Sequence, residues 1–227
     1  MARTRVKICG VCDEATAMCA VDAGADAVGL VLAEGSPRTV TPERAASVVR
    51  SIPAWVDAVG LFVDASADDV LATADRCGLH TVQLHGREGP GAARRLAEAG
   101  LRVLKAVAMS PGQTADDFAL WCGSSSPVRG LLWDAPTDRG GVAGGTGRTT
   151  DWAALASLGA HRREDGWPSM ILAGGLTPEN VGEAISVVRP YGVDVSSGVE
   201  SSRGVKDAGR VRAFCAAVRT ADGRDPG

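Results

Sequence analysis

The feature that most constrains the fold is an alternation, repeated eight times, between short apolar runs and amphipathic stretches. The apolar runs are rich in Val, Ile and Leu, which predicts buried strands, and the stretches after them predict helices. Continuous apolar strands that alternate with helices are typical of a parallel sheet covered on both faces. The predicted strands are residues 5–10, 26–32, 56–64, 80–86, 101–109, 128–135, 169–176 and 192–200. The predicted helices are residues 14–24, 41–52, 66–78, 90–100, 114–123, 150–159, 177–190 and 206–220.

The number of these units selects a fold class. Eight strand–helix units in 227 residues predict an α/β protein, a single (β/α)8 TIM barrel that spans residues 1–227 as one domain. The alternative is an open doubly wound sheet. Nucleotide-binding proteins of that class typically have a G-x-G-x-x-G motif after the first strand. The segment "CGVCDE" at residues 9–14 does not have that pattern, and neither a linker nor a second domain is visible in the sequence.

Charge and hydropathy exclude several classes of partner. The formal net charge is -3, so no basic footprint for nucleic acid and no polybasic membrane patch is expected. The N-terminal residues lack the apolar region of a signal peptide, and no apolar run approaches transmembrane length. We expect a cytoplasmic protein with a small-molecule substrate and no nucleic-acid or membrane partner. We also expect a monomer, with a homodimer as the alternative.

Cys9 and Cys12 have the C-x-x-C spacing of a redox pair or of half a zinc site. A zinc site needs a second ligand pair, and neither the other cysteines nor the three histidines supply one with metal-ligand spacing. We therefore expect no metal. A thiol redox function remains an alternative, and it predicts that replacing Cys12 is as damaging as replacing Cys9.

In a barrel of this kind the active site lies at the carboxyl ends of the strands. Cys9 closes the first predicted strand, and Lys7 shares its face because side chains alternate along a strand. A neighbouring ammonium group favours the thiolate and lowers the pKa of the cysteine, which makes Cys9 a candidate general base. Asp134 ends an apolar strand, where poor solvation favours the protonated acid and thus proton donation. The alternatives are a small buried apolar residue for Cys9 and a cap or ion-pair partner for Asp134.

Further polar residues follow other strands. Arg38 fits a substrate carboxylate, His85 fits a hydrogen bond to substrate, and Asp194 has the same alternatives as Asp134. Arg38 can equally be solvated, and His85 can satisfy a turn carbonyl. The loops "AGGL" at 173–176 and "SSG" at 196–198 offer small residues, free backbone N–H groups and the start of a short helix, which suits a phosphate. The alternative is that these glycines only make tight bends.

Several motifs together resemble one family. The segments "VKICG", "VGLFVD", "VQLHG", "GGTGRTTDW", "LAGGLTPENV" and "GVDVSSGVESSRGVKD" occur in order along nearly the whole chain and resemble phosphoribosylanthranilate isomerase. The resemblance implies a (β/α)8 barrel in tryptophan biosynthesis. It also implies an Amadori rearrangement of N-(5-phosphoribosyl)anthranilate to 1-(2-carboxyphenylamino)-1-deoxyribulose 5-phosphate, with no metal or organic cofactor.

The resemblance also implies residue roles. Cys9 is the expected general base, Asp134 the general acid, and Arg38 the ligand of the anthranilate carboxylate. His85 and Asp194 are expected to line the site, and Cys12 stands where the family often has threonine, so it is expected to be incidental. The expected phosphate ligands are Gly174, Gly175, Ser197 and Gly198. The loop expected to close over the substrate contains Gly144, Gly145, Thr146 and Gly147.

Two alternatives remain. A related or dual-substrate phosphosugar isomerase needs a second phosphate site, and the loops "VDASADD" and "LHGREGPG" do not resemble one. A catalytically silent phosphosugar-binding barrel could lack Cys9 or Asp134, but both residues are present.

Overall fold

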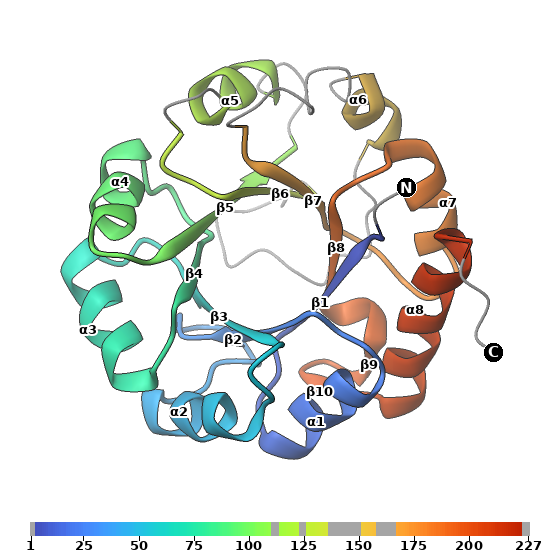
Figure 1. Cartoon of the computed structure of the whole chain (residues 1–227), viewed down its shortest axis with the longest axis horizontal. Helices are drawn as coiled ribbons and strands as arrows, with labels where there is room; N and C mark the ends of the chain where they lie inside the picture. Colours follow the sequence, from blue (N-terminus) through green and yellow to red (C-terminus); the bar gives the residue numbers. More distant parts are fainter. Residues whose placement is uncertain (1–2, 110–113, 123–125, 136–150, 158–166, 224–227) are drawn as a thin grey trace.

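The structure, a computed structural model, describes residues 3–109, 114–122, 126–135, 151–157 and 167–223. Eight parallel strands follow one another in chain order and form a closed barrel with helices on its outer side (Figure 1). The predicted fold class is therefore confirmed. The barrel strands are β1 (Arg5–Cys9), β2 (Ala27–Val31), β3 (Asp57–Phe62), β4 (Thr81–Leu84), β5 (Arg102–Ala108), β6 (Gly130–Asp134), β7 (Ser169–Leu172) and β8 (Gly192–Val195).

The helices begin where the chain supplies capping groups. Before α2, the Thr41 hydroxyl accepts a hydrogen bond from the backbone N–H of Arg44 at 3.3 Å, and Pro42 occupies the first turn. Asp13 and Asp207 cap α1 and α8 in the same way. The helices are α1 (Glu14–Asp22), α2 (Pro42–Ser51), α3 (Ala67–Cys77), α4 (Pro90–Glu98), α5 (Thr114–Trp121), α6 (Trp152–Ser157), α7 (Val181–Val188) and α8 (Ala208–Ala221).

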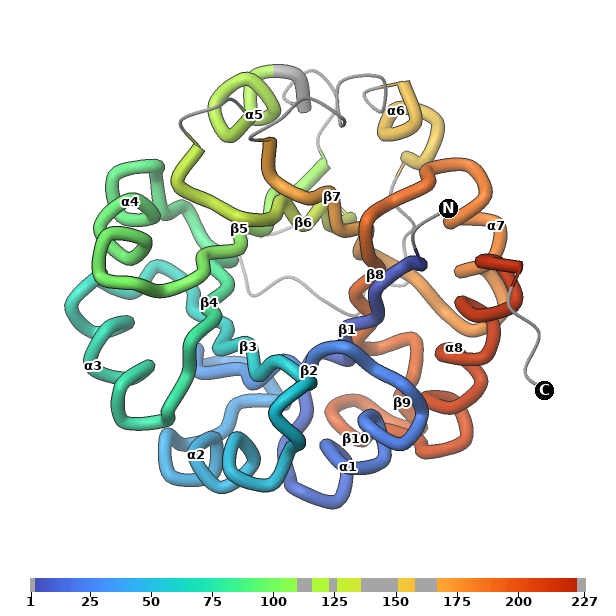
Figure 2. The backbone as a smooth tube through the Cα atoms, viewed as in Figure 1, coloured from blue at the N-terminus to red at the C-terminus, as the bar shows by residue number. Residues whose placement is uncertain are grey.

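The first and last parts of the chain close the barrel together. β1 and β8 pair in parallel, with Lys7 aligned to Asp194. The backbone trace shows α8 beside both α1 and α7 (Figure 2). Residues of the two ends of the sequence therefore share one side of the barrel, where side chains of β1, β2 and β8 meet.

Side chains of the strands alternate between two environments. On β1, Val6 and Ile8 belong to the large apolar core shared with the helices. Cys9 belongs instead to a separate small cluster with Val31 and Leu61. This alternation is the two-residue period of a strand, and it gives Lys7 and Cys9 the same face, as predicted.

The segment after β8 differs from the prediction. A single 3-10 turn, η2 (Ser197–Val199), is followed by a two-stranded antiparallel hairpin, β9 (Glu200–Ser202) and β10 (Val205–Lys206), before α8 begins. The expected short helix is present only as this 3-10 turn, which begins at Ser197 within the "SSG" segment, and the hairpin after it was not predicted. The short strands cannot be recognised from hydrophobic periodicity, because a two-residue strand has no measurable period.

Within the described ranges, no helix combines the length and the apolar character that a membrane span requires.

Candidate active site at the carboxyl ends of the strands

A buried ion pair lies beside the thiol of Cys9. The Nζ atom of Lys7 is 2.9 Å from Oδ1 of Asp194, and both side chains are less than one-tenth exposed. A Cβ atom built on Gly29 would lie 2.8 Å from Sγ of Cys9 and 3.0 Å from Nζ of Lys7. The thiol and the ammonium group therefore gather over the same glycine, and only a residue without a side chain leaves room for them there.

The pKa of Cys9 is shifted in the direction opposite to the predicted one. Burial raises the pKa of the thiol and is the largest effect, while Lys7 and Lys206 lower it and Asp194 raises it. Lys7 acts in the expected direction, but burial and Asp194 outweigh it, so the net shift is upward. Burial is also the largest single effect on Lys7 and lowers its pKa, but the charges and hydrogen bonds of Asp194 and Cys9 together outweigh burial and raise the pKa of this lysine. Lys7 therefore remains an ammonium group beside the thiol.

Arg38 is held by a carboxylate that the sequence interpretation missed. Its Nε and Nη2 atoms donate to the two carboxylate oxygens of Glu200 at 2.6 and 2.9 Å. Lys206 donates to Oε1 of Glu200 at 2.8 Å and to the carbonyl oxygen of Ser196 at 3.0 Å. Arg38 is thus neither solvated nor wholly free for substrate. Glu200 and Lys206 lie in the "GVESSRGVKD" segment, and their charge in an otherwise small-residue stretch was the available signal.

Asp134 ends β6 and faces His85, which follows β4. The distance between Nε2 of His85 and Oδ2 of Asp134 is 3.4 Å, and the other carboxylate oxygen of Asp134 accepts the backbone N–H of Ala135 at 2.8 Å. On its other side, Nδ1 of His85 lies 2.8 Å from Nε2 of Gln83. An amide NH2 group can only donate, so in this orientation Nδ1 accepts and the imidazole proton resides on Nε2, toward Asp134. His85 therefore contacts the candidate acid rather than a turn carbonyl.

The two glycine-rich loops after β7 and β8 are in direct contact. Gly174 and Gly175 have φ angles of 79° and 65°, in the left-handed region that favours glycine. A Cβ atom on Gly198 would lie only 1.8 Å from the carbonyl oxygen of Leu176. Gly198 and its neighbour Ser197 are thus brought against the loop after β7, which puts the four predicted phosphate ligands into one region.

Two other predictions concern the thiol pair and the closing loop. Cys9 and Cys12 are both free thiols, and Sγ of Cys12 lies 3.7 Å from the carbonyl oxygen of Gly10 and 3.6 Å from that of Arg38. The predicted closing loop, residues 144–147, lies outside the described residues.

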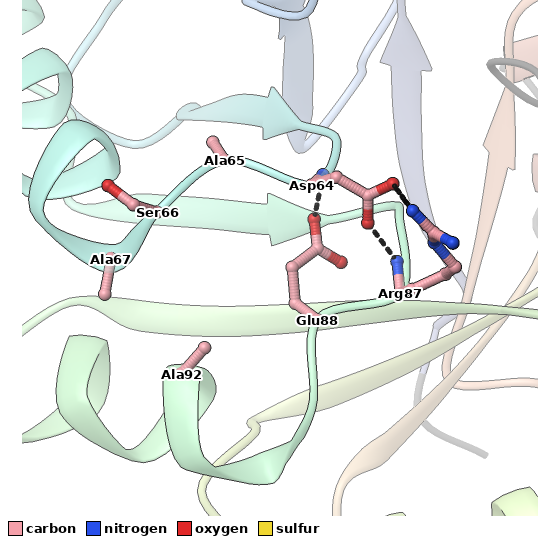
Figure 3. A pocket seen from close by; sticks show the side chains of 7 residues that line it. All are labelled: Asp64, Ala65, Ser66, Ala67, Arg87, Glu88 and Ala92. Carbon is pink, nitrogen blue, oxygen red and sulfur yellow. Dashed lines mark hydrogen bonds and ion pairs between the residues drawn. The ribbon is translucent and has the colours of Figure 1, made fainter.

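A surface pocket of about 430 Å³ lies elsewhere, between the loops that follow β3 and β4. It is lined by Asp64, Ala65, Ser66, Ala67, Arg87, Glu88 and Ala92 (Figure 3). None of the predicted site residues is among them. The carboxylate of Glu88 accepts the backbone N–H of Asp64 at 2.8 Å and pairs with the buried Lys105 at 2.9 Å. Both carboxylates are paired, Glu88 with Lys105 and Asp64 with Arg87, so the described residues leave no unpaired cation at this pocket to bind a second phosphate.

A closed (β/α)8 barrel with a buried thiol, a carboxylic acid and several cations at the carboxyl ends of its strands defines a barrel enzyme. Similarity to known proteins narrows this class of barrel enzymes to one family. The model of the N-(5'-phosphoribosyl)anthranilate (PRA) isomerase family matches residues 6–217. The N-(5'-phosphoribosyl)anthranilate isomerase of Pelobacter propionicus is 45% identical over 210 residues, which are 92% of this chain and 93% of the relative.

Solved structures agree with this match. The phosphoribosyl anthranilate isomerase of Thermus thermophilus is similar with a TM-score of 0.82 and 34% identity, covering 96% of this chain and 99% of the other. A second isomerase structure, in complex with reduced 1-(o-carboxyphenylamino)-1-deoxyribulose 5-phosphate, gives a TM-score of 0.80 and 34% identity over 97% of this chain and 99% of its own. The chain belongs to the N-(5'-phosphoribosyl)anthranilate isomerase family, and its function is that isomerisation in tryptophan biosynthesis.

Proposed function

We propose that Cys9 and Asp134 carry out the isomerisation as general base and general acid, without a metal or an organic cofactor. The observation that carries the proposal is their placement. The two residues end β1 and β6, which lie on different sides of the barrel with β7 and β8 between them (Figure 1). A substrate bound at the mouth of the barrel can therefore present different atoms to each group.

The reaction then divides into two proton transfers. Asp134 donates its proton to the furanose ring oxygen, the bond between C1 and this oxygen breaks, and the lone pair of the anthranilate nitrogen forms a protonated Schiff base. The thiolate of Cys9 removes the proton at C2, and the electron pair of that bond forms the C1–C2 double bond of an enolamine. The enolamine then tautomerises to the ketone, as its 2-hydroxyl group loses a proton to solvent and C1 takes one up from solvent. The substrate nitrogen supplies the electron sink, which explains why no cofactor is needed.

The remaining polar residues are proposed to bind and orient the substrate. Arg38 binds the anthranilate carboxylate, and His85 and Asp194 line the substrate site beside their partners Asp134 and Lys7. The phosphate is bound by the backbone N–H groups and hydroxyl of Gly174, Gly175, Ser197 and Gly198. We further propose a single cytoplasmic domain that functions as a monomer.

Turnover in D2O tests the chemical steps. The wild-type protein is dialysed against EDTA and supplied with N-(5-phosphoribosyl)anthranilate alone. We expect full turnover and solvent deuterium at C1 of the product, because in the proposed steps the proton added at C1 comes from solvent. A requirement for an added metal or cofactor, or complete transfer of the C2 hydrogen to C1, would contradict the proposal.

A further inference from the structure

The buried carboxylate of Glu200 accepts hydrogen bonds from three different residues. Its side chain is only 4% exposed, and it accepts hydrogen bonds from Arg38, from Lys206 and from the backbone N–H of Gly204 at 3.1 Å. Burial alone would raise the pKa of this carboxyl, but the hydrogen bonds from Arg38 and Lys206 outweigh it and lower the pKa to about 2. Glu200 is therefore ionised and fixed in one orientation.

The position of Glu200 is set by the hairpin β9–β10. The hairpin is anchored to the end of β8 by Lys206, which donates to the carbonyl oxygen of Ser196. It also lies against the loop that carries Arg38, because a Cβ atom on Gly204 would lie 3.0 Å from the carbonyl oxygen of Pro37. The hairpin, which is not part of the barrel sheet, thus places the carboxylate of Glu200 next to Arg38.

The geometry of the contact leaves one edge of the guanidinium group available. Glu200 occupies the edge formed by Nε and Nη2, while Nη1 has no hydrogen-bond partner in the part of the chain that the structure describes. The aliphatic part of the Arg38 side chain packs against Gly10, where an added Cβ atom would lie 2.4 Å from Cδ of the arginine. The arginine is held between a carboxylate and a glycine, with its Nη1–Nη2 edge still able to bind a second planar anion.

The local charge favours such an anion. Around Cys9 the described residues place three buried cations, Lys7, Arg38 and Lys206, and two buried carboxylates, Asp194 and Glu200. While the thiol of Cys9 is protonated, one positive charge is therefore uncompensated at this side of the barrel. A buried charge without a partner is unfavourable, and a substrate anion would balance it.

We infer that Glu200 is a positioning residue that orients Arg38, so that the Nη1–Nη2 edge binds the carboxylate of the substrate's aromatic ring in a fixed geometry. The inference rests on the proposed function, because it assigns the anthranilate carboxylate to Arg38. It goes further by making discrimination for that carboxylate depend on Glu200 and on the hairpin that carries it, neither of which touches the substrate.

A pair of ligands separates this role from a structural one. The first ligand is reduced 1-(o-carboxyphenylamino)-1-deoxyribulose 5-phosphate, and the second is the same compound without the ring carboxylate. Both are titrated calorimetrically into wild type and Glu200→Gln, and KM and kcat are measured in parallel. We expect the variant to bind the carboxylate ligand about ten- to a hundredfold more weakly, with little change for the second ligand and a larger effect on KM than on kcat.

The matched control is Asp26→Asn. Asp26 also binds an arginine, Arg3, through both carboxylate oxygens and accepts the backbone N–H of Val6 at 2.9 Å, but it precedes β2 at the opposite end of the barrel. This variant should leave the ratio of the two affinities as in wild type. In an Arg38→Gln background, Glu200→Gln should cause no further change of the ratio. If Glu200→Gln does not fold, Glu200→Asp tests the same ratio with a carboxylate that is one methylene shorter.

The possible outcomes separate failure of the role of Glu200 from failure of the proposed substrate site. If Glu200→Gln leaves the ratio of the two affinities unchanged, even when both affinities fall, the positioning role of Glu200 is overturned. A wild-type protein that binds both ligands equally overturns the assignment of Arg38 to the carboxylate. A wild-type protein that binds neither ligand overturns the proposed substrate site itself.

Discussion

The Nζ atom of Lys7 lies 2.9 Å from Oδ1 of Asp194, across the junction that closes the barrel. The two residues are 187 positions apart in the sequence and are aligned as partners on β1 and β8. Because Cys9 is two residues beyond Lys7 on the same strand face, closure of the barrel also fixes an ammonium group beside the thiol. Folding and the reactivity of the candidate base are thus linked through one ion pair.

Replacing Lys7 with methionine should change both stability and the pH profile. Asp194 would remain buried without its partner, which should lower the free energy of unfolding by about 3–5 kcal/mol. The pKa of Cys9, already raised by burial, should rise further because Lys7 favours the thiolate. The rising limb of kcat/KM against pH should therefore move to higher pH. Urea unfolding and a pH–rate profile measure the two effects.

Two variants control for general damage. Lys7→Met combined with Asp194→Asn removes both charges and should recover part of the lost stability. Lys105→Met breaks an equally short buried pair, Lys105–Glu88, and should cost stability without moving the pH profile. A profile that stays in place in Lys7→Met, or that moves as far in Lys105→Met, would show that Lys7 does not tune the thiol.

Glu200 should make stability depend on acid pH. Its pKa is lowered from 4.5 to about 2, so its contribution is complete above pH 4.5 and is lost as the pH falls toward 2. The shift corresponds to about 3 kcal/mol. The difference in unfolding free energy between wild type and Glu200→Gln should therefore be largest at about pH 6 and should shrink at about pH 3. A difference that is the same at both values would mean that the carboxylate is not held in its ionised form.

Gly198→Ala should impair binding of the substrate phosphate. The added methyl group would lie 1.8 Å from the carbonyl oxygen of Leu176, so the loops after β7 and β8 must separate. Displacement on this scale should raise KM about tenfold or more and weaken inhibition by inorganic phosphate.

The control for this substitution is Gly182→Ala in α7, where no atom lies within 4 Å of the added group. It should leave KM unchanged and raise the unfolding free energy by about 1 kcal/mol, since alanine is the better helix former. If Gly198→Ala also leaves KM and phosphate inhibition unchanged, the phosphate does not bind between these loops.

Much of the framework could be predicted from the sequence, because it depends on local pattern. Apolar runs place the strands, Thr41 and Pro42 start α2, and the two-residue period gives Lys7 and Cys9 one face. The carboxyl ends of the strands then indicate where functional groups gather, which brought Asp134 and His85 to attention.

The features that the sequence could not predict depend on contacts between distant segments. Glu200 lies 162 residues from Arg38, and only the closed barrel and the β9–β10 hairpin bring them together. The raised pKa of Cys9 follows from its burial, a property of the folded protein rather than of the neighbouring Lys7. The Gln83–His85 contact lies along one strand face, and the alternation of "QLH" was the signal for it.

Cys12 provides the test of the spacing that it shares with Cys9. Its thiol faces the carbonyl groups of Gly10 and Arg38, and burial raises its pKa. Cys12→Ser places a hydroxyl donor at the same carbonyl groups, so it should retain most of the wild-type activity. An equal loss of activity in Cys12→Ser and Cys9→Ser would instead indicate a thiol pair.

The measurement that tests the central claim most directly is turnover of freshly prepared N-(5-phosphoribosyl)anthranilate by wild type, Cys9→Ser, Asp134→Asn and Cys12→Ser, with folding checked by circular dichroism. We predict that Cys9→Ser and Asp134→Asn each lose about 10²–10⁴-fold in kcat while binding the reduced product analogue as wild type does. Folded Cys9→Ser or Asp134→Asn protein with near wild-type kcat would contradict the assignment of Cys9 as base and Asp134 as acid.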